Sequence, residues 1–172
     1  MFWKRKDADR PESVAASGGE PLAPVRVYTA DATIDGWVYL AGQRLSDVLN
    51  AEELLSVSSV PFRPAQKDWI AIERSEALLV AAPPRIADRR LRSHRVKRNI
   101  LLLSGHYVVR GLVHMVPGIS VDSLLARSRQ HFLALTDTLV TSSYRPEIED
   151  RHPAVLVNVL STVQQLKFEV LE

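Results

Sequence analysis

The sequence predicts a mainly β fold of the α+β type, built as two tandem small β-barrel-like or bent-sheet units that each contain one short helix. Three observations predict it. One segment of the chain is repeated, short apolar runs alternate with polar residues as strands do, and turn residues separate these runs. Because 46% of the 172 residues are apolar, the chain can bury a core.

The repeat sets the architecture, because a fixed offset between two similar segments indicates two copies of one structural unit. Residues 25–54 align without a gap with residues 100–129, at an offset of 75. Chance predicts about two identities over such a length, and five are found. The identical pairs are Gly36/Gly111, Val38/Val113, Asp47/Asp122, Leu49/Leu124 and Ala51/Ala126. Two unrelated β-hairpins followed by helices would share much of this pattern, so that alternative stays open.

The first unit, residues 25–81, is predicted to contain five strands and one helix. Its first two strands, residues 25–29 and 33–40, form a hairpin, and Gly36 predicts a bulge or sharp bend in the second strand. Ser46 is the expected N-cap of a short helix whose first turn holds Asp47. A strand over residues 55–60 follows. Residues 69–72 and 77–80 are predicted to close the unit as a hairpin.

The second unit, residues 100–172, is predicted to repeat the same order of elements. A long hairpin turns at Ser104-Gly105, and Ser120 caps a helix that runs to about Gln130. Residues 132–135 and 138–141 are predicted as two strands, and residues 154–170 as a closing hairpin. Each unit therefore has the order β-β-α-β-β-β or close to it, which favours a bent antiparallel sheet or a partly open barrel.

Two segments of unusual composition flank the first unit. Residues 1–24 are rich in Pro, Ala, Ser and Gly and are predicted to form a mobile N-terminal tail. Residues 82–99 open with the pair Pro83-Pro84, which excludes a helix at that point, and are predicted to form a basic linker between the units.

Residues 44–50 (RLSDVLN) resemble a signature of an uncharacterised bacterial family of small β-rich domains of unknown function. Strands of the form V-x-V-x-T and I-x-G-x-V precede that signature in the family, and residues 25–29 and 34–38 match them. The family's F-L-x-L-T strand is found only in the second unit, at residues 132–136, and that unit lacks the signature itself. The resemblance implies a small β-rich domain, present twice in this chain, and no known activity.

The linker is the most strongly charged segment of the chain. It carries seven basic residues and one acidic residue, whereas the two units carry net charges of −3 and −1. Clustered cations of this kind bind phosphates through charge-assisted hydrogen bonds and counterion release. They are therefore the candidate site for nucleic acid or an anionic membrane surface, and the alternative is a solvated arm that pairs with the acidic units. The candidate residues are Arg85, Arg89, Arg90, Arg92, Arg95, Lys97 and Arg98.

The sequence has no motif of a catalytic centre, and we predict no catalytic residues, no metal and no cofactor. None of the five histidines has a recognised ligand spacing, and the usual phosphate-binding glycine loops are absent. Asp47 and Asp122 are explained by the first turn of their own helices. Trp37, Tyr39 and Trp69 are a candidate stacking platform for single-stranded nucleic acid, with core packing as the alternative.

Three functions fit these features. The first is a non-enzymatic interaction or scaffolding protein whose partner is another protein. The second is a nucleic-acid-binding module that uses the linker and a barrel face, and the third is a small-ligand-binding protein with a pocket between the units. The absence of cysteine and of a transmembrane segment predicts a cytoplasmic protein, with peripheral membrane contact through residues 1–6 as an alternative.

Overall fold

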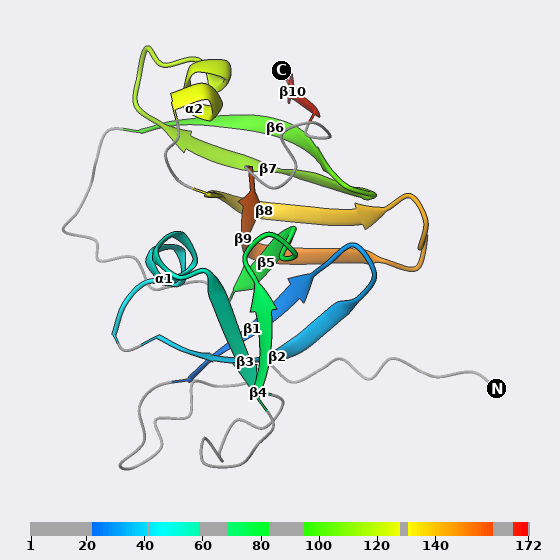
Figure 1. Cartoon of the computed structure of the whole chain (residues 1–172). Helices are drawn as coiled ribbons and strands as arrows, with labels where there is room; N and C mark the ends of the chain where they lie inside the picture. The colour runs from blue at the N-terminus through cyan, green and yellow to red at the C-terminus, as the bar shows by residue number, and fades with distance from the viewer. Residues whose placement is uncertain are drawn as a thin grey trace.

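The computed structural model describes residues 22–40, 42–58, 69–82, 95–127, 131–159 and 167–171. Two halves of the chain, before and after residue 90, contain the same succession of elements (Figure 1). The first half contains β1 (Leu22–Tyr28), β2 (Thr33–Tyr39), α1 (Leu45–Ala51), β3 (Leu54–Ser58), β4 (Trp69–Glu73) and β5 (Leu79–Ala82). The second half contains β6 (Val96–Ser104), β7 (Tyr107–Met115), α2 (Val121–Arg127), β8 (Phe132–Ser142), β9 (Glu149–Asn158) and β10 (Lys167–Leu171).

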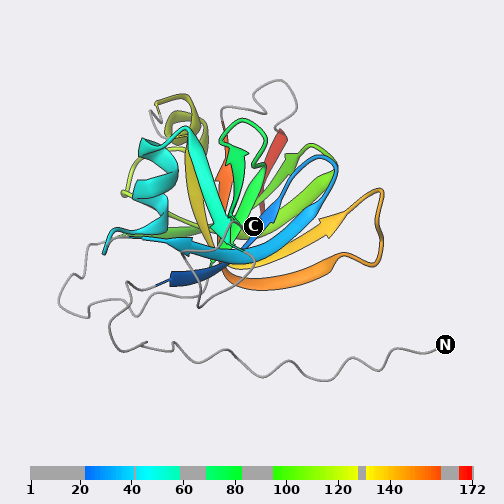
Figure 2. The ribbon, with the colours of Figure 1, turned by 60° about the horizontal axis from the view of Figure 1, so that its bottom comes forward.

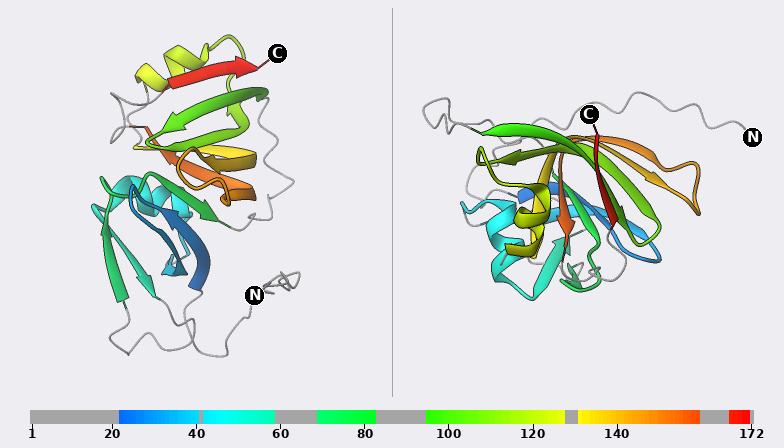
Figure 3. Two further views of the ribbon diagram at one scale, coloured as in Figure 1. Left: turned by 90° about the vertical axis from the view of Figure 1, so that its right-hand side faces the viewer. Right: turned by 90° about the horizontal axis from the view of Figure 1, so that it is seen from above.

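All these strands belong to one antiparallel sheet, and the prediction of a mainly β fold is confirmed. The strand order is β10-β6-β7-β8-β9-β5-β1-β2-β3-β4. Among the described residues, β10 and β4 do not pair with each other, so the sheet is open and is not a closed barrel. The sheet passes from the second half into the first at the β9–β5 pair, as the left panel of Figure 3 shows.

The two halves use one strand order. If the strands of each half are numbered from one to five, both halves have the order fifth, first, second, third, fourth. The opening hairpins also share their register, since Val25 lies opposite Gly36 and Ile100 lies opposite Gly111. Both pairs are related by the offset of 75 seen in the sequence.

Both predicted closing hairpins are wrong. β4 pairs with β3, whereas the next strand in the chain, β5, pairs with β1 and β9. In the second half, β9 pairs with β8 and β5, whereas β10 pairs with β6. The physical reason is visible in β5, where all four residues are apolar and three are buried, so this strand needs a central place in the sheet.

Each half has a hydrophobic core, but each core takes side chains from the other half. The core of the second half includes Tyr28 and Leu79, and the core of the first half includes Phe132 and Leu156. Because successive side chains of a strand point to opposite faces, Leu79 enters one core and Val80 enters the other. The junction strand is therefore buried on both faces.

The second half bends where β7 meets β8. The β7–β8 register shifts between Arg110 and Leu112, and Asp137 has a positive φ of 50°. A Cβ atom on Gly111 would lie 3.1 Å from the carbonyl oxygen of Thr136, so glycine permits this close approach. The opening hairpins are regular in both halves, since the β1–β2 register runs without interruption through Gly36 and the β6–β7 register through Gly111.

Both helices are short and lie on the same side of the molecule (Figures 1 and 2). The prediction that Ser120 caps the second helix is confirmed, because its Oγ accepts a hydrogen bond of 3.1 Å from the N–H of Ser123. The corresponding prediction for Ser46 is wrong, since α1 begins at Leu45 and its N-cap is Arg44, two residues before Ser46, without a side-chain cap. Acidic residues occupy the first turn of both helices, as expected.

Candidate interaction site at the junction and the sheet edges

The junction between the halves is a regular antiparallel ladder. Leu79 lies opposite Val157 and Ala82 lies opposite Ala154, and the N–H of Asn158 extends the ladder by donating to the carbonyl of Leu78 (2.9 Å). Val80 and Val155 have no exposed surface. Main-chain hydrogen bonds and the burial of apolar side chains on both faces therefore join the halves.

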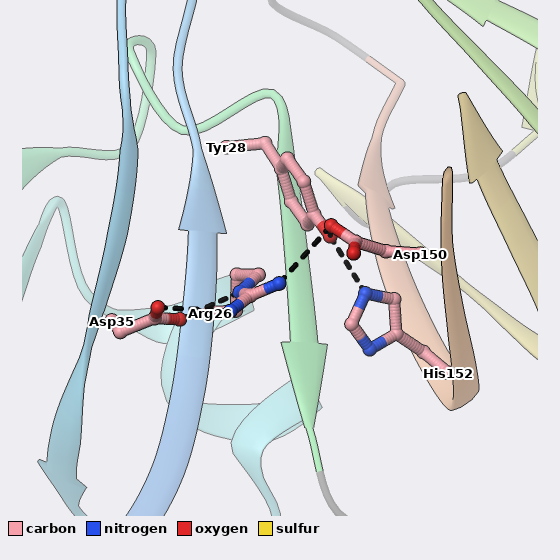
Figure 4. Close-up of polar contacts among 5 residues, drawn as sticks. All are labelled: Arg26, Tyr28, Asp35, Asp150 and His152. Carbon is pink, nitrogen blue, oxygen red and sulfur yellow. Dashed lines mark hydrogen bonds and ion pairs between the residues drawn. The ribbon is translucent and has the colours of Figure 1, made fainter. Parts of the chain in front are cut away.

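A polar cluster crosses one end of this junction. The Tyr28 hydroxyl of β1 lies 2.9 Å from Oδ2 of Asp150 and 2.6 Å from Nε2 of His152, both on β9 (Figure 4). The Tyr28 ring is fully buried and packs edge-on against Tyr107, with ring centroids 5.3 Å apart. A side chain from the first half is thus held by two polar groups of the second half.

Arg26 extends the cluster toward solvent. Its guanidinium donates to both carboxylate oxygens of Asp35 on β2, at 2.6 and 2.9 Å, and to Oδ2 of Asp150 at 3.1 Å. The Asp35 side chain is 64% exposed, whereas that of Asp150 is 27% exposed. The shielded half of the network therefore spans the junction, and its outer half lies within the first hairpin.

The electrostatics of the cluster give its hydrogen bonds a direction. Burial raises the pKa of the Tyr28 hydroxyl, and the hydrogen bond to Asp150 adds to this rise. Burial also lowers the pKa of His152, so the imidazole is neutral at neutral pH. With the Tyr28 proton donated to Asp150, Nε2 of His152 carries a proton and donates it to the Tyr28 oxygen. Because its pKa is raised, the Tyr28 hydroxyl keeps its proton at neutral pH and can donate it to Asp150.

Amide side chains cross the other end of the junction. Nδ2 of Asn158 donates to the carbonyls of Arg74 (2.7 Å) and Ala77 (3.0 Å), so the end of β9 holds the turn before β5. Oδ1 of Asn50 in α1 accepts from the N–H of Phe132 (3.0 Å) at the start of β8. Both amides satisfy main-chain groups that would otherwise be buried without partners.

A shallow depression of about 590 Å³ lies beside these amides, between the two halves. Glu53, Glu73 and Arg74 line it from the first half, and His131 and Asn158 from the second. Burial, with a smaller effect of Arg74, lowers the pKa of His131. This is the part of the molecule where the ligand-binding hypothesis expects a pocket.

The structure describes only part of the predicted phosphate-binding segment. Arg85, Arg89, Arg90 and Arg92 lie outside the described residues. Arg95, Lys97 and Arg98 are exposed at the start of β6, and none of the three forms an ion pair with a carboxylate in the described part of the chain. For these three residues, the described carboxylates do not provide the internal pairing that was the alternative to anion binding.

The register places the predicted aromatic platform on one face of the first half. Trp37 and Trp69 lie in one row, each opposite Ser58 on the strand between them. Tyr39 is two residues further along β2 and 37% exposed, so it shares this face. The platform and the basic residues of β6 belong to strands near opposite ends of the sheet order, so the sheet does not place them on neighbouring strands.

Histidines and carboxylates do not gather into a metal site in the ranges that the structure describes. His106 packs against Tyr144, with ring centroids 5.4 Å apart, and His114 bonds to Oγ1 of Thr136 at 2.9 Å. Each of these imidazoles therefore has its own local neighbours.

The polar cluster at the junction has no counterpart in the sequence predictions. The charged, proline-containing residues 144–153 are typical of a loop between strands, but β9 begins at Glu149, so Asp150 and His152 lie in this strand. They lie 122 and 124 residues from Tyr28. The only local signal is the alternation of Arg26 and Tyr28 with Val25 and Val27. That alternation places the two polar groups in one strand but does not name their partners.

Comparison of the chain with family models, with curated proteins and with solved structures gives no significant match. Neither described helix has the length and apolar character of a membrane-spanning segment. The geometry of the junction and of the sheet edges is therefore the basis for a functional proposal.

Proposed function

We propose that this protein is a non-enzymatic scaffolding protein that binds protein partners by strand addition at the two edges of its sheet. One observation carries the proposal: the sheet already extends from one half to the other through the β9–β5 ladder and then ends in β4 and β10. Strand addition to a sheet edge is a common mode of protein recognition, since the main chain supplies the hydrogen bonds.

The composition of β4 supports this use. Sheet edges that must stay unpaired usually carry lysine, proline or bulges. The strand Trp69–Glu73 has neither lysine nor proline, and its Ile70 side chain is 49% exposed. An apolar edge of this kind is suited to accept a further strand.

The likeness of the two halves also supports the proposal. The common strand order, the common hairpin register and the sequence offset of 75 fit two copies of one ββαβββ unit, which is part of the proposal. If the halves are two copies of one unit, the β9–β5 ladder joins them by adding a strand of one copy to the sheet edge of the other. The same main-chain hydrogen bonds can add a strand of a partner protein to β4 or β10.

Affinity purification with Ala71→Pro tests the proposal. Proline at an edge strand removes one outward N–H group and leaves the inner ladder in place. A partner should be captured by the wild type and by Ala71→Ser, which keeps the N–H group, and lost with Ala71→Pro. Circular dichroism confirms that both variants fold, and a partner retained by folded Ala71→Pro contradicts the proposal.

Binding of a polyanion is a second candidate, favoured by Arg95, Lys97 and Arg98, which are exposed and form no ion pair with a described carboxylate. If it is correct, the affinity for generic RNA or DNA falls steeply with salt, because bound cations release counterions. The triple variant Arg95→Gln, Lys97→Gln, Arg98→Gln should then lower both the affinity and the salt dependence. No binding at low salt would contradict this candidate.

A further inference from the structure

We infer that copies of this chain join head to tail, with β10 of one copy pairing with β4 of the next in a defined register. The inference rests on the proposed function, because it names the partner that the two sheet edges accept. It would extend the sheet of each molecule by the kind of ladder that already joins its own halves.

The first step is that the strands at the two ends of the sheet correspond to the two strands that meet at the junction. At the junction, the fourth strand of the second half (β9) pairs with the fifth strand of the first half (β5). The two ends of the sheet are the fourth strand of the first half (β4) and the fifth strand of the second half (β10). The molecule therefore ends in the same two kinds of strand that meet at its centre, and one end complements the other.

The second step is the position-by-position equivalence of β4 and β9. Leu112 is the counterpart of Trp37, because the two are 75 residues apart. Across the strands, Trp37 lies opposite Ser58, which lies opposite Trp69. In the same way, Leu112 lies opposite Thr136, which lies opposite Ala154, so Ala154 is the counterpart of Trp69. The next residues of the two strands are equivalent as well, so Val155 of β9 is the counterpart of Ile70 of β4.

Burial differs sharply between these equivalent residues. Val155 has no exposed surface, whereas Ile70 is 49% exposed. One residue further, Leu156 is buried in the core of the first half, whereas Ala71 is exposed. The difference follows from β5, which covers β9 and has no counterpart beside β4 within the described residues.

The third step is the direction of the main-chain groups on β4. The N–H of Arg74 donates to the carbonyl of Glu53 (2.8 Å), and bonded pairs alternate along an antiparallel ladder. Ile72 and Ile70 therefore bond inward to β3, and the N–H and C=O of Ala71 are directed to the outer edge. Leu156, the residue equivalent to Ala71, uses its outward groups to pair with β5.

The register between copies follows from β10. Val27 and Leu102 are related by the offset of 75; Val27 lies opposite Val80, and Leu102 lies opposite Phe168. Phe168 is thus equivalent to Val80. Since Val80 lies opposite Leu156 at the junction, Phe168 of one copy should lie opposite Ala71 of the next.

The neighbouring pairs follow at once, with Glu169 opposite Ile70 and Lys167 opposite Ile72. Such an interface is heterologous, because two different edges meet. Repetition of it gives a closed ring when the rotation per junction closes, and an open filament when it does not. A two-fold dimer that pairs β4 with β4 is a different arrangement.

Cysteine cross-linking tests this register directly, because the chain contains no cysteine of its own. In the inferred ladder, Ile70 and Glu169 form a non-hydrogen-bonded pair with Cα atoms about 4.5 Å apart, within the range of a disulfide. The double variant Ile70→Cys, Glu169→Cys should give a series of disulfide-linked oligomers under mild oxidation. The control Ile70→Cys, Phe168→Cys should lose this cross-linking, because a shift by one residue turns the second cysteine to the opposite face.

The single variants define the polarity of the interface. A mixture of Ile70→Cys and Glu169→Cys should give linked dimers, and neither variant should cross-link alone. Efficient cross-linking of Ile70→Cys alone would show β4–β4 pairing and would overturn the inference. Equal cross-linking by the two double variants would also overturn it.

The mass of the unmodified protein completes the test. Light scattering should give a multiple of the chain mass for the wild type and the monomer mass for Ala71→Pro. A wild type that stays monomeric at its highest soluble concentration overturns the inference. If Ala71→Pro then still abolishes capture of a different protein, the proposed function stands and only the identity of the partner is wrong.

Discussion

The strands β9 and β4 hold the same place in the two halves but differ in what lies beside them. In β9, Val155 and Leu156 are buried beside β5, which pairs with this strand. β4 has Ile70 and Ala71 exposed at the equivalent positions. The comparison shows that, among the described residues, a strand at the same place in each half is buried where a further strand pairs with it and exposed where none does.

The two ends of the junction also differ in how they bind the halves together. At one end, side chains meet side chains, as Tyr28 bonds to Asp150 and His152. At the other end, the amides of Asn158 and Asn50 bond to main-chain groups. The contacts of Tyr28 depend on the protonation of Asp150 and His152, whereas those of the amides do not. Of the two, only the first should therefore make the free energy of unfolding depend on pH.

The largest effect is expected from Leu79→Ala at the junction. Leu79 has no exposed surface and belongs to the core of the second half, so its truncation should lower the free energy of unfolding by about 2–5 kcal/mol. Urea denaturation of the wild type and the variant measures this. A loss below about 1 kcal/mol would show that the junction is not a core, because surface changes have effects of that size.

The next effect is expected from Tyr28→Phe, which keeps the ring and removes the hydroxyl. Asp150 and His152 each lose a partner, so the free energy of unfolding should fall by about 1–3 kcal/mol. Tyr107→Phe is the matched control, because its hydroxyl donates to the main-chain carbonyl of Thr29 (3.1 Å). An equal loss in both variants would contradict a special role for the cluster.

A smaller effect is expected from pH, and its sign follows from His152. Burial lowers the pKa of His152 below the ordinary value of 6.5, opposed by the nearby Asp150 and Asp35 and assisted by Arg26. As pH falls below 6.5, the unfolded chain takes up a proton that the folded imidazole resists. The free energy of unfolding should therefore decrease from neutral pH toward the lowered pKa of the folded state.

The variant His152→Gln isolates this contribution to the pH dependence. Its urea midpoint should change less than that of the wild type between about pH 7.5 and pH 5.5, a range that spans the ordinary histidine pKa. The remaining dependence comes from other groups, since burial also lowers the pKa of His106, His114 and His131. An unchanged dependence would exclude His152 as a contributor.

The smallest effect is expected from Ile70→Ala on β4, the strand at the end of the described sheet. In the Ala71→Pro background, which blocks the edge, half-exposed Ile70 should contribute at most about 1 kcal/mol to the free energy of unfolding. In the otherwise wild-type chain, the same change should also weaken association between copies. A loss as large as that of Leu79→Ala in the blocked background would remove the contrast between edge and junction.

Local features of the sequence predict many of the elements and some of their details. Ser120 caps α2 because it precedes the helix directly, and Pro117-Gly118 lies in a turn, with φ of 83° at Gly118. The strands predicted over residues 132–135 and 138–141 are one strand, β8, because pairing with β9 continues on both sides of Asp137, which adopts a positive φ. A local pattern marks this position as irregular but does not show that pairing continues beyond it.

Alternation and composition establish which residues are strand-forming, which face each side chain takes and that the first two strands of each half form a hairpin. The neighbours of β5 and β10, the sharing of side chains between two cores and the meeting of Tyr28 with His152 come only from the tertiary structure. The reason is physical: a strand has two edges and two faces, and a residue's nearest neighbours in the sequence occupy neither edge. The partners that fill them come from distant parts of the chain, so they are chosen by the burial that the whole sheet permits.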